Sequence, residues 1–349
     1  MAQSRERSSP ETKVPPKHLA FGLSNLDVQN LYSQMVLTRA LDERLWALNR
    51  QGKVALVASC QGAEAASMGS ALAALKDGDF FFFPYYRDLP LKLMAGITTL
   101  EAMISHFGKA GDSFSGGRQF LLQGASLTNR IIHISNVVGS NLCQATGYAL
   151  GCKTLNEQTV VLASFGDGGS SEGECHEAMN FAGIHRLPIV FLCYNNKLAI
   201  SVPQKKQMAI ENIADRAVGY NFPGYVVDGT DILEVYYQTK SAIVRARSPS
   251  GGPTLLELKI ERLKPHTSDD DDRRYRTPKE LKESHKRDPL VRLQTYLQET
   301  GLLIPSEQKR IQRQAQQEID EVTKAGEQAP WPDPATLLEK IYASTEETL

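Results

Sequence analysis

Two short stretches of the sequence carry residue types that could hold a metal ion. One reads GDGGSSEG from Gly166 and the other reads NNKLAIS from Asn195, and each directly follows an apolar run. Asp167 offers a carboxylate and Asn196 an amide oxygen, and hard oxygen ligands of this kind suit Mg²⁺. The glycines around Asp167 let a bulky group approach the backbone. This pattern predicts a diphosphate held through Mg²⁺.

The elements that must position these residues form a β-α-β unit. Apolar runs at 159–165 and 187–194 predict two strands, and the segment between them has helical spacing. Strands joined in this way run parallel, and open parallel sheets bind ligands beyond the carboxyl ends of their strands. The helix also directs its free N–H groups at this edge, as in phosphate sites. GDGG alone could be a simple strand-to-helix turn, but its pairing with Asn196 favours a binding site.

The remaining pattern predicts an α/β fold in which helices flank a mostly parallel sheet. Further helices are expected at 24–50, 62–76, 90–106 and 231–247, and further strands begin at 80, 131, 225 and 254. The expected organisation is a disordered tail at 1–20, a diphosphate-binding domain at 21–277 and a charged helical extension at 278–349.

Composition excludes several classes of protein. The 349 residues carry 39 basic and 40 acidic side chains, so the net charge of −1 gives no reason to expect nucleic acid or an anionic membrane as a partner. Every apolar run is shorter than the roughly 20 residues of a membrane helix. The five cysteines form no CxxC pair, which disfavours a disulfide framework or a zinc site and indicates the reducing cytoplasm.

The full stretch GDGGSSEGECHEAMNFAGIHRLPIVFLCYNNKLAIS resembles the alpha subunit of the decarboxylating component of 2-oxo acid dehydrogenases. In that family GDG followed by NN is the thiamine diphosphate motif. The resemblance runs from about residue 24 to 345 and includes YYRD at 85–88, GGRQ at 116–119 and KPHTSDDDDRRYR at 264–276. It implies a thiamine diphosphate-binding fold and an oxidoreductase that acts on 2-oxo acids with a lipoyl acceptor.

The resemblance also implies the site residues. Mg²⁺ would be bound by the side chains of Asp167 and Asn196 and the carbonyl of Leu198. Tyr194 stands where relatives often have Arg, which removes one charged contact to the diphosphate. The implied cofactor-binding residues are Tyr86, Arg87, Asn136, Val138, Asp167, Gly168, Gly169, Tyr194, Asn196, Arg262 and His266. A structural K⁺ would use oxygens of Ser135, Ser140 and Asn141, although Val137 replaces the usual Pro.

His266 is the implied catalytic residue. A lone histidine is usually a surface residue, but within PHTSDDDD of this family it faces the substrate and the acylation of the lipoyl group. An imidazole can donate a hydrogen bond and exchange protons near neutrality. The acids at 269–272 would hold this loop in order against neighbouring arginines. Thr267 matches a serine that is phosphorylated in mitochondrial relatives, but without a dedicated kinase we expect no such regulation.

The resemblance further implies partners. No glutamate in this chain has the context needed to activate the aminopyrimidine ring, and in the family that residue comes from a beta subunit. We therefore expect an α2β2 heterotetramer that passes its acyl group to a lipoyl-bearing acyltransferase core. HTSDDDDRRYR resembles branched-chain members more than pyruvate members, while pyruvate and acetoin-type substrates stay open. A binding subunit with a decayed thiamine site is the first alternative, and the intact Asp167, Asn196 and His266 argue against it. A Rossmann enzyme is the second, but it would need GxGxxG after its first strand, whereas GDGGSSEG follows a middle strand.

Overall fold

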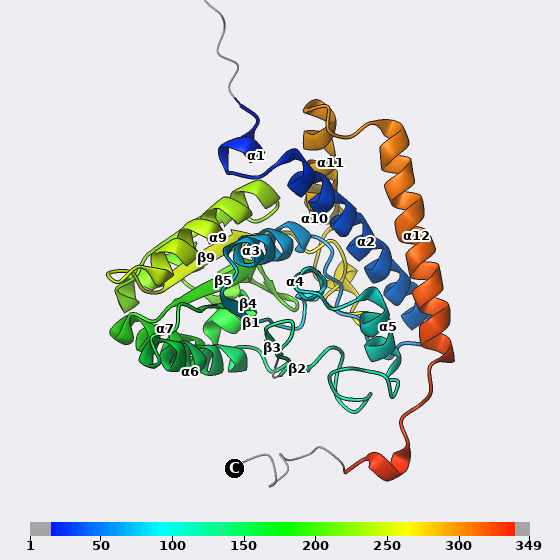
Figure 1. Cartoon of the computed structure of the whole chain (residues 1–349), viewed down its shortest axis with the longest axis horizontal. Coiled ribbons are helices and arrows are strands. Elements are labelled where there is room, and N and C mark those ends of the chain that lie inside the picture. Colours follow the sequence, from blue (N-terminus) through cyan, green and yellow to red (C-terminus); the bar gives the residue numbers. More distant parts are fainter. Residues whose placement is uncertain (1–14, 134, 339–349) are drawn as a thin grey trace, which may run out of the picture.

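A seven-stranded sheet lies at the centre of the computed structural model, which describes residues 15–133 and 135–338 (Figure 1). The strand order is β2-β3-β1-β4-β5-β9-β8, and every neighbouring pair is parallel except β2 and β3. The strands are β1 (Phe80–Phe83), β2 (Gly124–Ser126), β3 (Ile131–His133), β4 (Val160–Gly166), β5 (Ile189–Asn195), β8 (Gly224–Asp228) and β9 (Thr254–Lys259). The predicted α/β class with a mostly parallel sheet is confirmed.

Helices cover both faces of this sheet, as its buried strands require. Helices α3 (Glu64–Asp77) and α9 (Ile232–Arg247) pack together on one face, and α6 (Ser140–Thr154) and α7 (Gly173–His185) pack on the other (Figure 1). Strand β5 is buried at all seven positions. The central strands therefore offer solvent and ligands only their ends.

The N-terminal part departs from the expected tail. Residues 1–14 lie outside the described residues, but Lys17–Ala20 form helix α1, in which His18 is buried. The imidazole of His18 bonds the hydroxyl of Tyr296 and the side-chain oxygen of Asn25, which ties α1 to the body. The disordered tail predicted for residues 1–20 is thus wrong for residues 17–20. Helix α2 (Asn25–Arg50) follows, with a capping box between Ser24 and Asp27.

The helix expected at 90–106 is two helices. Helix α4 (Leu89–Met94) ends before Gly96, which has φ +111°, and α5 (Thr99–Phe107) begins with a capping box between Thr98 and Glu101. A left-handed glycine followed by a strong N-cap ends one helix and starts the next. Strand β3 confirms the strand expected to begin at 131, whereas β2, joined to it by residues 127–130, is a further element that the apolar pattern did not predict.

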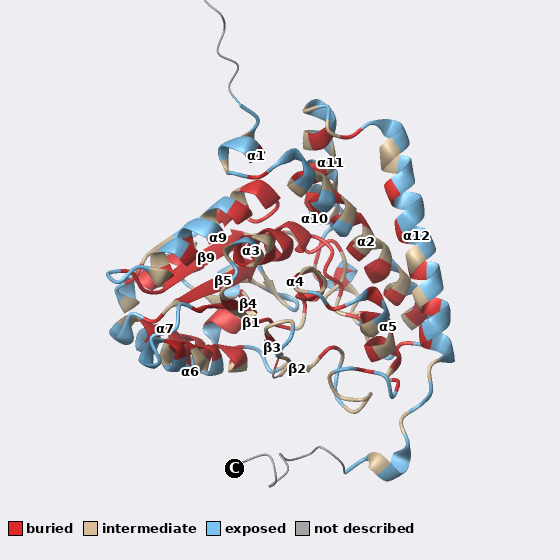
Figure 2. Cartoon of the chain, in the orientation of Figure 1, coloured by how far each residue is buried: buried red, intermediate tan, exposed pale blue. Residues whose placement is uncertain are grey.

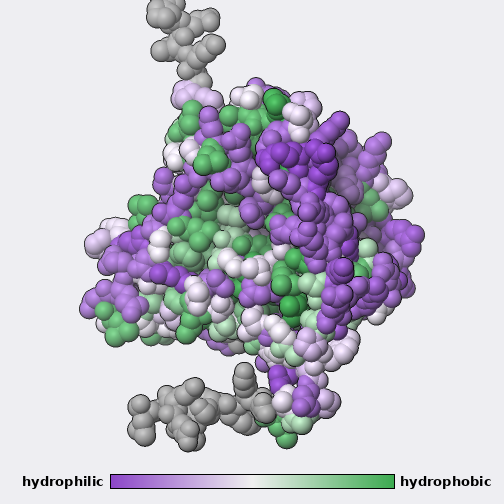
Figure 3. Space-filling view, turned by 45° about the vertical axis from the view of Figure 1, so that its right-hand side comes forward, coloured by the Kyte–Doolittle hydropathy of each residue, from purple (hydrophilic) through white to green (hydrophobic). Residues whose placement is uncertain are grey.

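The C-terminal residues form the helices expected after residue 277. They are α10 (Pro278–His285), α11 (Pro289–Glu299) and α12 (Pro305–Gln328). Helix α12 lies along α2 and α5, buries one stripe and exposes the rest (Figures 1 and 2). Its outer side contributes to a strongly hydrophilic surface (Figure 3). Leu293, Leu297 and Ile319 belong to the same core as α2 and α3, so these helices share the core of the sheet domain.

Short elements complete the described chain. They are the two-stranded sheet of β6 (Leu198–Ala199) and β7 (Val202–Pro203), helix α8 (Gln204–Gln207), and the 3₁₀ turns η1 (Gly168–Ser171), η2 (Ile213–Tyr220), η3 (Asp272–Arg274) and η4 (Pro334–Thr336). None of the helices in the described ranges is both long and apolar enough to cross a membrane.

Candidate active site

The ends of β4 and β5 bring Asp167 and Asn196 together. In the parallel ladder Gly166 pairs with Tyr194, so both strands end at the same edge of the sheet. The backbone N–H of Asn196 donates to Oδ1 of Asp167 at 3.3 Å. The expected meeting of the two side chains follows from this register, because parallel strands of matched length end side by side.

The oxygens at this edge are free to bind a cation. Asp167 Oδ2 and Asn196 Oδ1 are both buried and have no hydrogen-bond partner. Buried polar atoms without partners are rare and usually mark a ligand or strain. Burial raises the pKa of Asp167 to about 6, and the Asn196 N–H opposes this only in part. A divalent cation between the two side chains would satisfy both oxygens and stabilise the carboxylate, so these residues fit Mg²⁺.

Gln207 holds the turn that carries Asp167, and it was not among the predicted site residues. Its Nε2 donates to the carbonyl of Asp167 at 2.6 Å and to Oγ of Ser171 at 2.9 Å. These bonds span η1, a 3₁₀ turn that separates β4 from α7. The predicted helix is confirmed as α7, which begins at Gly173 after this turn. Gln207 lies 40 residues from Asp167 in the chain, which is why no local motif includes it.

A cavity of about 820 Å³ opens at this edge. Ten of the predicted site residues line it: Tyr86, Arg87, Asn136, Val138, Asp167, Gly168, Gly169, Asn196, Leu198 and His266. The loops add lining residues that sequence reasoning missed, namely Leu56, Ala58, Phe120, Gln123 and Ile200. Asn136 Oδ1 is a further buried acceptor without a partner. The size of the cavity and its mixed polar and apolar lining suit an organic cofactor with a charged end.

Two predicted site residues do not line the cavity. The ring of Tyr194 is fully buried behind Tyr85, and the two ring centroids are 5.5 Å apart in an edge-on arrangement. Arg262 is 3 % exposed and donates from Nη2 to the carbonyl of Ile200 and the hydroxyl of Tyr275. Its Nε and Nη1 have no partner. Both residues therefore stand one layer behind the lining.

Arg87 and His266 form the polar wall of the cavity. Arg87 donates to the carbonyl of Ser59 at 2.7 Å and to the carbonyl of His266 at 3.2 Å. Its Nη2 also lies 3.2 Å from Nδ1 of His266. Because a guanidinium can only donate, Nδ1 must accept, so the proton of the neutral ring sits on Nε2. Burial, with the positive charges of Arg87 and Arg262, lowers the pKa of His266 to about 4.

The loop after His266 is held at several points. Asp270 accepts from the backbone N–H of His266 at 2.9 Å and from the hydroxyl of Tyr275. Ser268 exchanges two bonds with the backbone of Val57, at 2.9 and 3.1 Å. The buried pair Asp272–Arg276 closes the loop. The acids expected to order this segment do so in part, through Asp270 and Asp272.

With this geometry in place, the comparisons with known proteins decide the family. The sequence matches the family described as "Dehydrogenase E1 component" over residues 32–335. The chain belongs to that family. Within the E1 family it is 44 % identical to the "2-oxoisovalerate dehydrogenase subunit alpha" of Bacillus subtilis over 327 residues, which cover 94 % of this chain and 98 % of the relative.

Two further E1 relatives are less similar. The "3-methyl-2-oxobutanoate dehydrogenase subunit alpha" of Mycobacterium tuberculosis is 39 % identical over 90 % of this chain and 82 % of its own length. The "Pyruvate dehydrogenase E1 component subunit alpha" of Staphylococcus aureus is 35 % identical over 94 % of this chain and 85 % of its own. The resemblance to alpha subunits of this family is therefore confirmed over nearly the whole chain.

Proposed function

We propose that this chain is the alpha subunit of a dehydrogenase that oxidatively decarboxylates a branched-chain 2-oxo acid and transfers the acyl group to a lipoyl group. The observation that carries the proposal is the pair of free, buried oxygens, Asp167 Oδ2 and Asn196 Oδ1, at the head of the cavity. The higher identity to the 2-oxoisovalerate and 3-methyl-2-oxobutanoate relatives, compared with the pyruvate relative, favours a branched substrate.

Thiamine diphosphate with Mg²⁺ is the proposed cofactor. Asp167 and Asn196 would bind Mg²⁺ through their side chains and Leu198 through its carbonyl, while Gly168 and Gly169 leave room for the diphosphate. When bound, the cofactor supplies the carbon nucleophile and electron sink of decarboxylation. Charge balance supports this assignment, because the positive charge of Mg²⁺ would offset the negative charges of the Asp167 carboxylate and the diphosphate.

The other wall of the cavity would act on the substrate. Arg87 holds the ring of His266 through Nδ1 and through the carbonyl, which fixes Nε2–H as the donor. A neutral imidazole in this state donates a hydrogen bond to an oxygen that gains negative charge. Its low pKa keeps the ring neutral at physiological pH. We therefore assign His266 to substrate and acyl-group contacts, while Arg87 positions it.

A beta subunit is the proposed partner at the cavity mouth. Several exposed apolar side chains gather there: Phe120, Val137, Val138 and Ile200, each at least 40 % exposed. Apolar side chains grouped in this way usually meet a partner surface. We propose an α2β2 assembly in which the beta subunit closes the cavity and supplies the missing glutamate. A lipoyl-bearing acyltransferase core would accept the acyl group.

Two finer proposals complete the assignment. A structural K⁺ would bind through oxygens of Ser135, Ser140 and Asn141, in the loop where Ser135 Oγ accepts from the N–H of Val137 and Ser140 Oγ donates to the carbonyl of Val137. The test compares the thermal stability of this loop in K⁺ with its thermal stability in Na⁺, and K⁺ should stabilise the loop more. We place the protein in the cytoplasm, where its five free cysteines would stay reduced.

The decisive experiment co-expresses the chain with its beta subunit. Turnover of 2-oxoisovalerate and of pyruvate would be compared with thiamine diphosphate and Mg²⁺ present or omitted. We expect cofactor-dependent turnover with a preference for 2-oxoisovalerate. A preference for pyruvate would move the assignment to the second candidate, which the Staphylococcus relative supports. Turnover of neither substrate by a formed complex would overturn the proposal, and an acetoin-type substrate would be assayed next.

Asp167→Asn tests the cofactor site directly. Burial of the unpaired carboxylate already disfavours the charged form, so the amide should leave the thermal midpoint of the cofactor-free complex equal or higher. The added stabilisation by thiamine diphosphate and Mg²⁺ should be lost, because ligand binding stabilises only a chain that binds. Asp320→Asn, an exposed change on α12, is the control. Equal stabilisation of Asp167→Asn and wild type by the cofactor would refute the site.

A further inference from the structure

Lys92 is a fully buried lysine that the proposed chemistry does not use, and burial lowers its pKa to about 7 although the charge of Asp88 opposes this. It lies on α4, five residues after Arg87, and is 1 % exposed. Within the described part of the chain it forms no ion pair. Its Nζ instead lies 3.1 Å from the carbonyl of Leu122 and 2.7 Å from Nδ1 of His133. A buried ammonium is costly to desolvate, so an arrangement without a carboxylate partner calls for an explanation.

The two partners of Lys92 lie where two walls of the cavity begin. The ladder between β2 and β3 ends at the pair Gly124 and His133. Beyond this pair one strand leads into Gln123 and Phe120, and the other leads to Ser135, Asn136 and Val138, all of which line the cavity. Lys92 therefore bridges the two chain segments at the point where backbone pairing between them stops.

The backbone at Leu122 needs such support. Leu122 has φ +54°, a left-handed conformation that is unfavourable for a residue with a side chain. Both of its backbone polar groups are held by buried side chains, because the N–H donates to Oγ of Ser105 at 2.9 Å and the carbonyl accepts from Lys92. Helices α4 and α5 thus clamp one strained residue from two sides.

The chemistry of His133 matches this role. The ring is fully buried, and its Nδ1 lies 2.7 Å from Nζ of Lys92 and 2.9 Å from the carbonyl of Leu122, so the three groups form one cluster. Burial together with the charge of Lys92 lowers the pKa of His133 to about 3, so the ring stays neutral. The Nζ group of Lys92 contacts the ring and the Leu122 carbonyl together. A methionine or leucine at position 92 would fill the space but remove the polar group that joins α4 to both of them.

We propose that Lys92 is a positioning residue of the cavity, which fixes the carbonyl of Leu122 and the ring of His133 and thereby sets the spacing of the walls at 120–123 and 135–138. Lys92 lies on α4, which begins two residues after Arg87, so Lys92 also connects these two walls with the polar wall formed by Arg87 and His266. This inference rests on the proposed function in one respect, that the cavity is the cofactor and substrate site.

The test uses the alpha chain assembled with its beta subunit. Lys92→Met keeps length without donors, Lys92→Gln keeps one donor group, and Lys240→Met removes an exposed lysine on α9 as a matched control. The first measurement is the rate of hydrogen exchange in peptides covering 119–138. The second set consists of KM for the 2-oxo acid and Kd for thiamine diphosphate, whose changes are compared with the change in kcat.

We expect Lys92→Met to speed exchange in 119–138 at least fivefold, and to raise KM and Kd at least fivefold while kcat changes less than twofold. Lys92→Gln should restore part of each effect, and it replaces Lys92→Met if that variant fails to assemble. Unchanged exchange in 119–138 would overturn the proposal. So would faster exchange spread evenly over the chain with normal KM and Kd, which indicates a role in stability alone. If the wild-type complex binds no thiamine diphosphate, the proposed function fails, and the exchange data still decide the positioning role.

Discussion

At the scale of single residues, the site separates residues that bind from residues that orient. Asp167 and Asn196 present free oxygens, whereas Gln207 and Arg87 use their donors on neighbouring protein groups. Sequence motifs revealed the first kind, because a ligand imposes its own residue types and spacing. Orienting residues bond to backbone carbonyls, which any residue provides, so they are predicted only where they fall within a binding motif, as Arg87 does in YYRD. Gln207 and Lys92 lie outside such motifs and emerged only with the structure.

His266 should affect acyl transfer without affecting cofactor binding. We expect His266→Ala in the assembled enzyme to bind thiamine diphosphate within about threefold of wild type, because Asp167 and Asn196 remain. Reductive acylation of a lipoyl group should fall by about 10²-fold or more, the usual scale for loss of a hydrogen-bond donor to an oxygen that gains negative charge. Stopped-flow acylation and cofactor titration measure the two effects. Wild-type rates of lipoyl acylation would contradict the role given to His266.

His106 should make stability depend on pH. It is buried on α5, its Nδ1 donates to the carbonyl of Ala102 at 2.7 Å, and burial lowers its pKa to about 4. The unfolded chain binds a proton at this residue below about pH 6.5, while the folded chain stays neutral down to about pH 4. The contribution of His106 to the unfolding free energy is therefore fully present above about pH 6.5 and is lost as the pH falls towards about 4.

The measurement is the difference in unfolding free energy between wild type and His106→Gln as a function of pH. Wild type should lose about 2 kcal/mol of unfolding free energy relative to His106→Gln when the pH falls from 8 to 5. The value follows from a slope of about 1.4 kcal/mol per pH unit below about pH 6.5. Using a difference cancels other titrating groups such as Asp88, whose pKa burial raises to about 6. A difference that does not change with pH would show that His106 titrates normally in the folded state.

At the scale of elements, the sequence predicted best the elements that are buried and that have a regular apolar pattern over many residues. Strands β4, β5 and β9 and helices α2, α7 and α9 lie within two residues of their expected bounds at most ends. The break between α4 and α5 was missed because apolar spacing continues across Gly96. Strand β2, which pairs with the expected strand β3, was missed because Gly, Ser, Thr and Asn in 124–130 read as loop, and the contact of Lys92 with the adjacent Leu122 is long-range.

The packing of α12 on α5 gives a prediction for this scale. A Cβ added at Gly326 would lie 2.9 Å from Cγ of Met103 and from the ring of Phe107. Gly326→Ala should therefore lower the unfolding free energy by about 1–3 kcal/mol, although alanine is the better helix former. Gly151→Ala on α6, where the added Cβ meets nothing within 4 Å, is the matched control and should raise it by about 0.5–1 kcal/mol. Chemical denaturation decides between the two signs.

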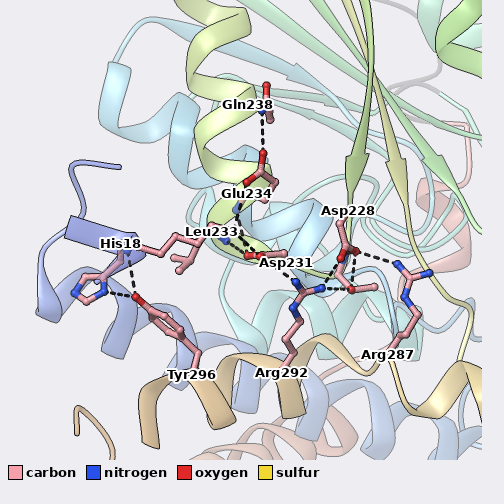
Figure 4. A network of polar contacts seen from close by, with 11 residues as sticks. His18, Asp228, Asp231, Leu233, Glu234, Gln238, Arg287, Arg292 and Tyr296 are labelled. Atoms are coloured by element: carbon pink, nitrogen blue, oxygen red, sulfur yellow. Dashed lines mark hydrogen bonds and ion pairs between the residues drawn. The ribbon is translucent and has the colours of Figure 1, made fainter. Parts of the chain in front are cut away.

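At the scale of the whole molecule, an ionic network joins parts that are far apart in sequence (Figure 4). Arg292 on α11 pairs with Asp228 at the end of β8 and with Asp231 before α9, and Lys17 of α1 pairs with Asp231 as well. Burial would raise the pKa of Asp228, but hydrogen bonds from Arg292 and Thr230 lower it to about 2. The N-terminal helix, the sheet edge and the C-terminal helices are thus held in one arrangement.

Arg292→Ala should weaken this arrangement only slightly. The side chains of Arg292 and Asp228 are 44 % and 40 % exposed, so solvent screens the pair and we expect a loss of at most about 1 kcal/mol. The loss should shrink towards zero at 1 M salt, where the screening length is about 3 Å. Lys309→Ala, an exposed lysine of α12, is the control. A loss independent of salt would mean that packing, not charge, holds α11 on the sheet.

The division of the cavity between strand ends and loops has a consequence for how such an enzyme can change. The end proposed to bind the cation is built on β4 and β5, whose register and burial leave little freedom. Other lining residues, such as Leu56 and Ala58, lie in loops that no ladder constrains. Laboratory evolution towards a larger or smaller 2-oxo acid can therefore diversify those loop positions freely while the scaffold and its cofactor stay intact. A new substrate specificity would then arise from changes in the loop residues, while the residues at the ends of β4 and β5 stay the same.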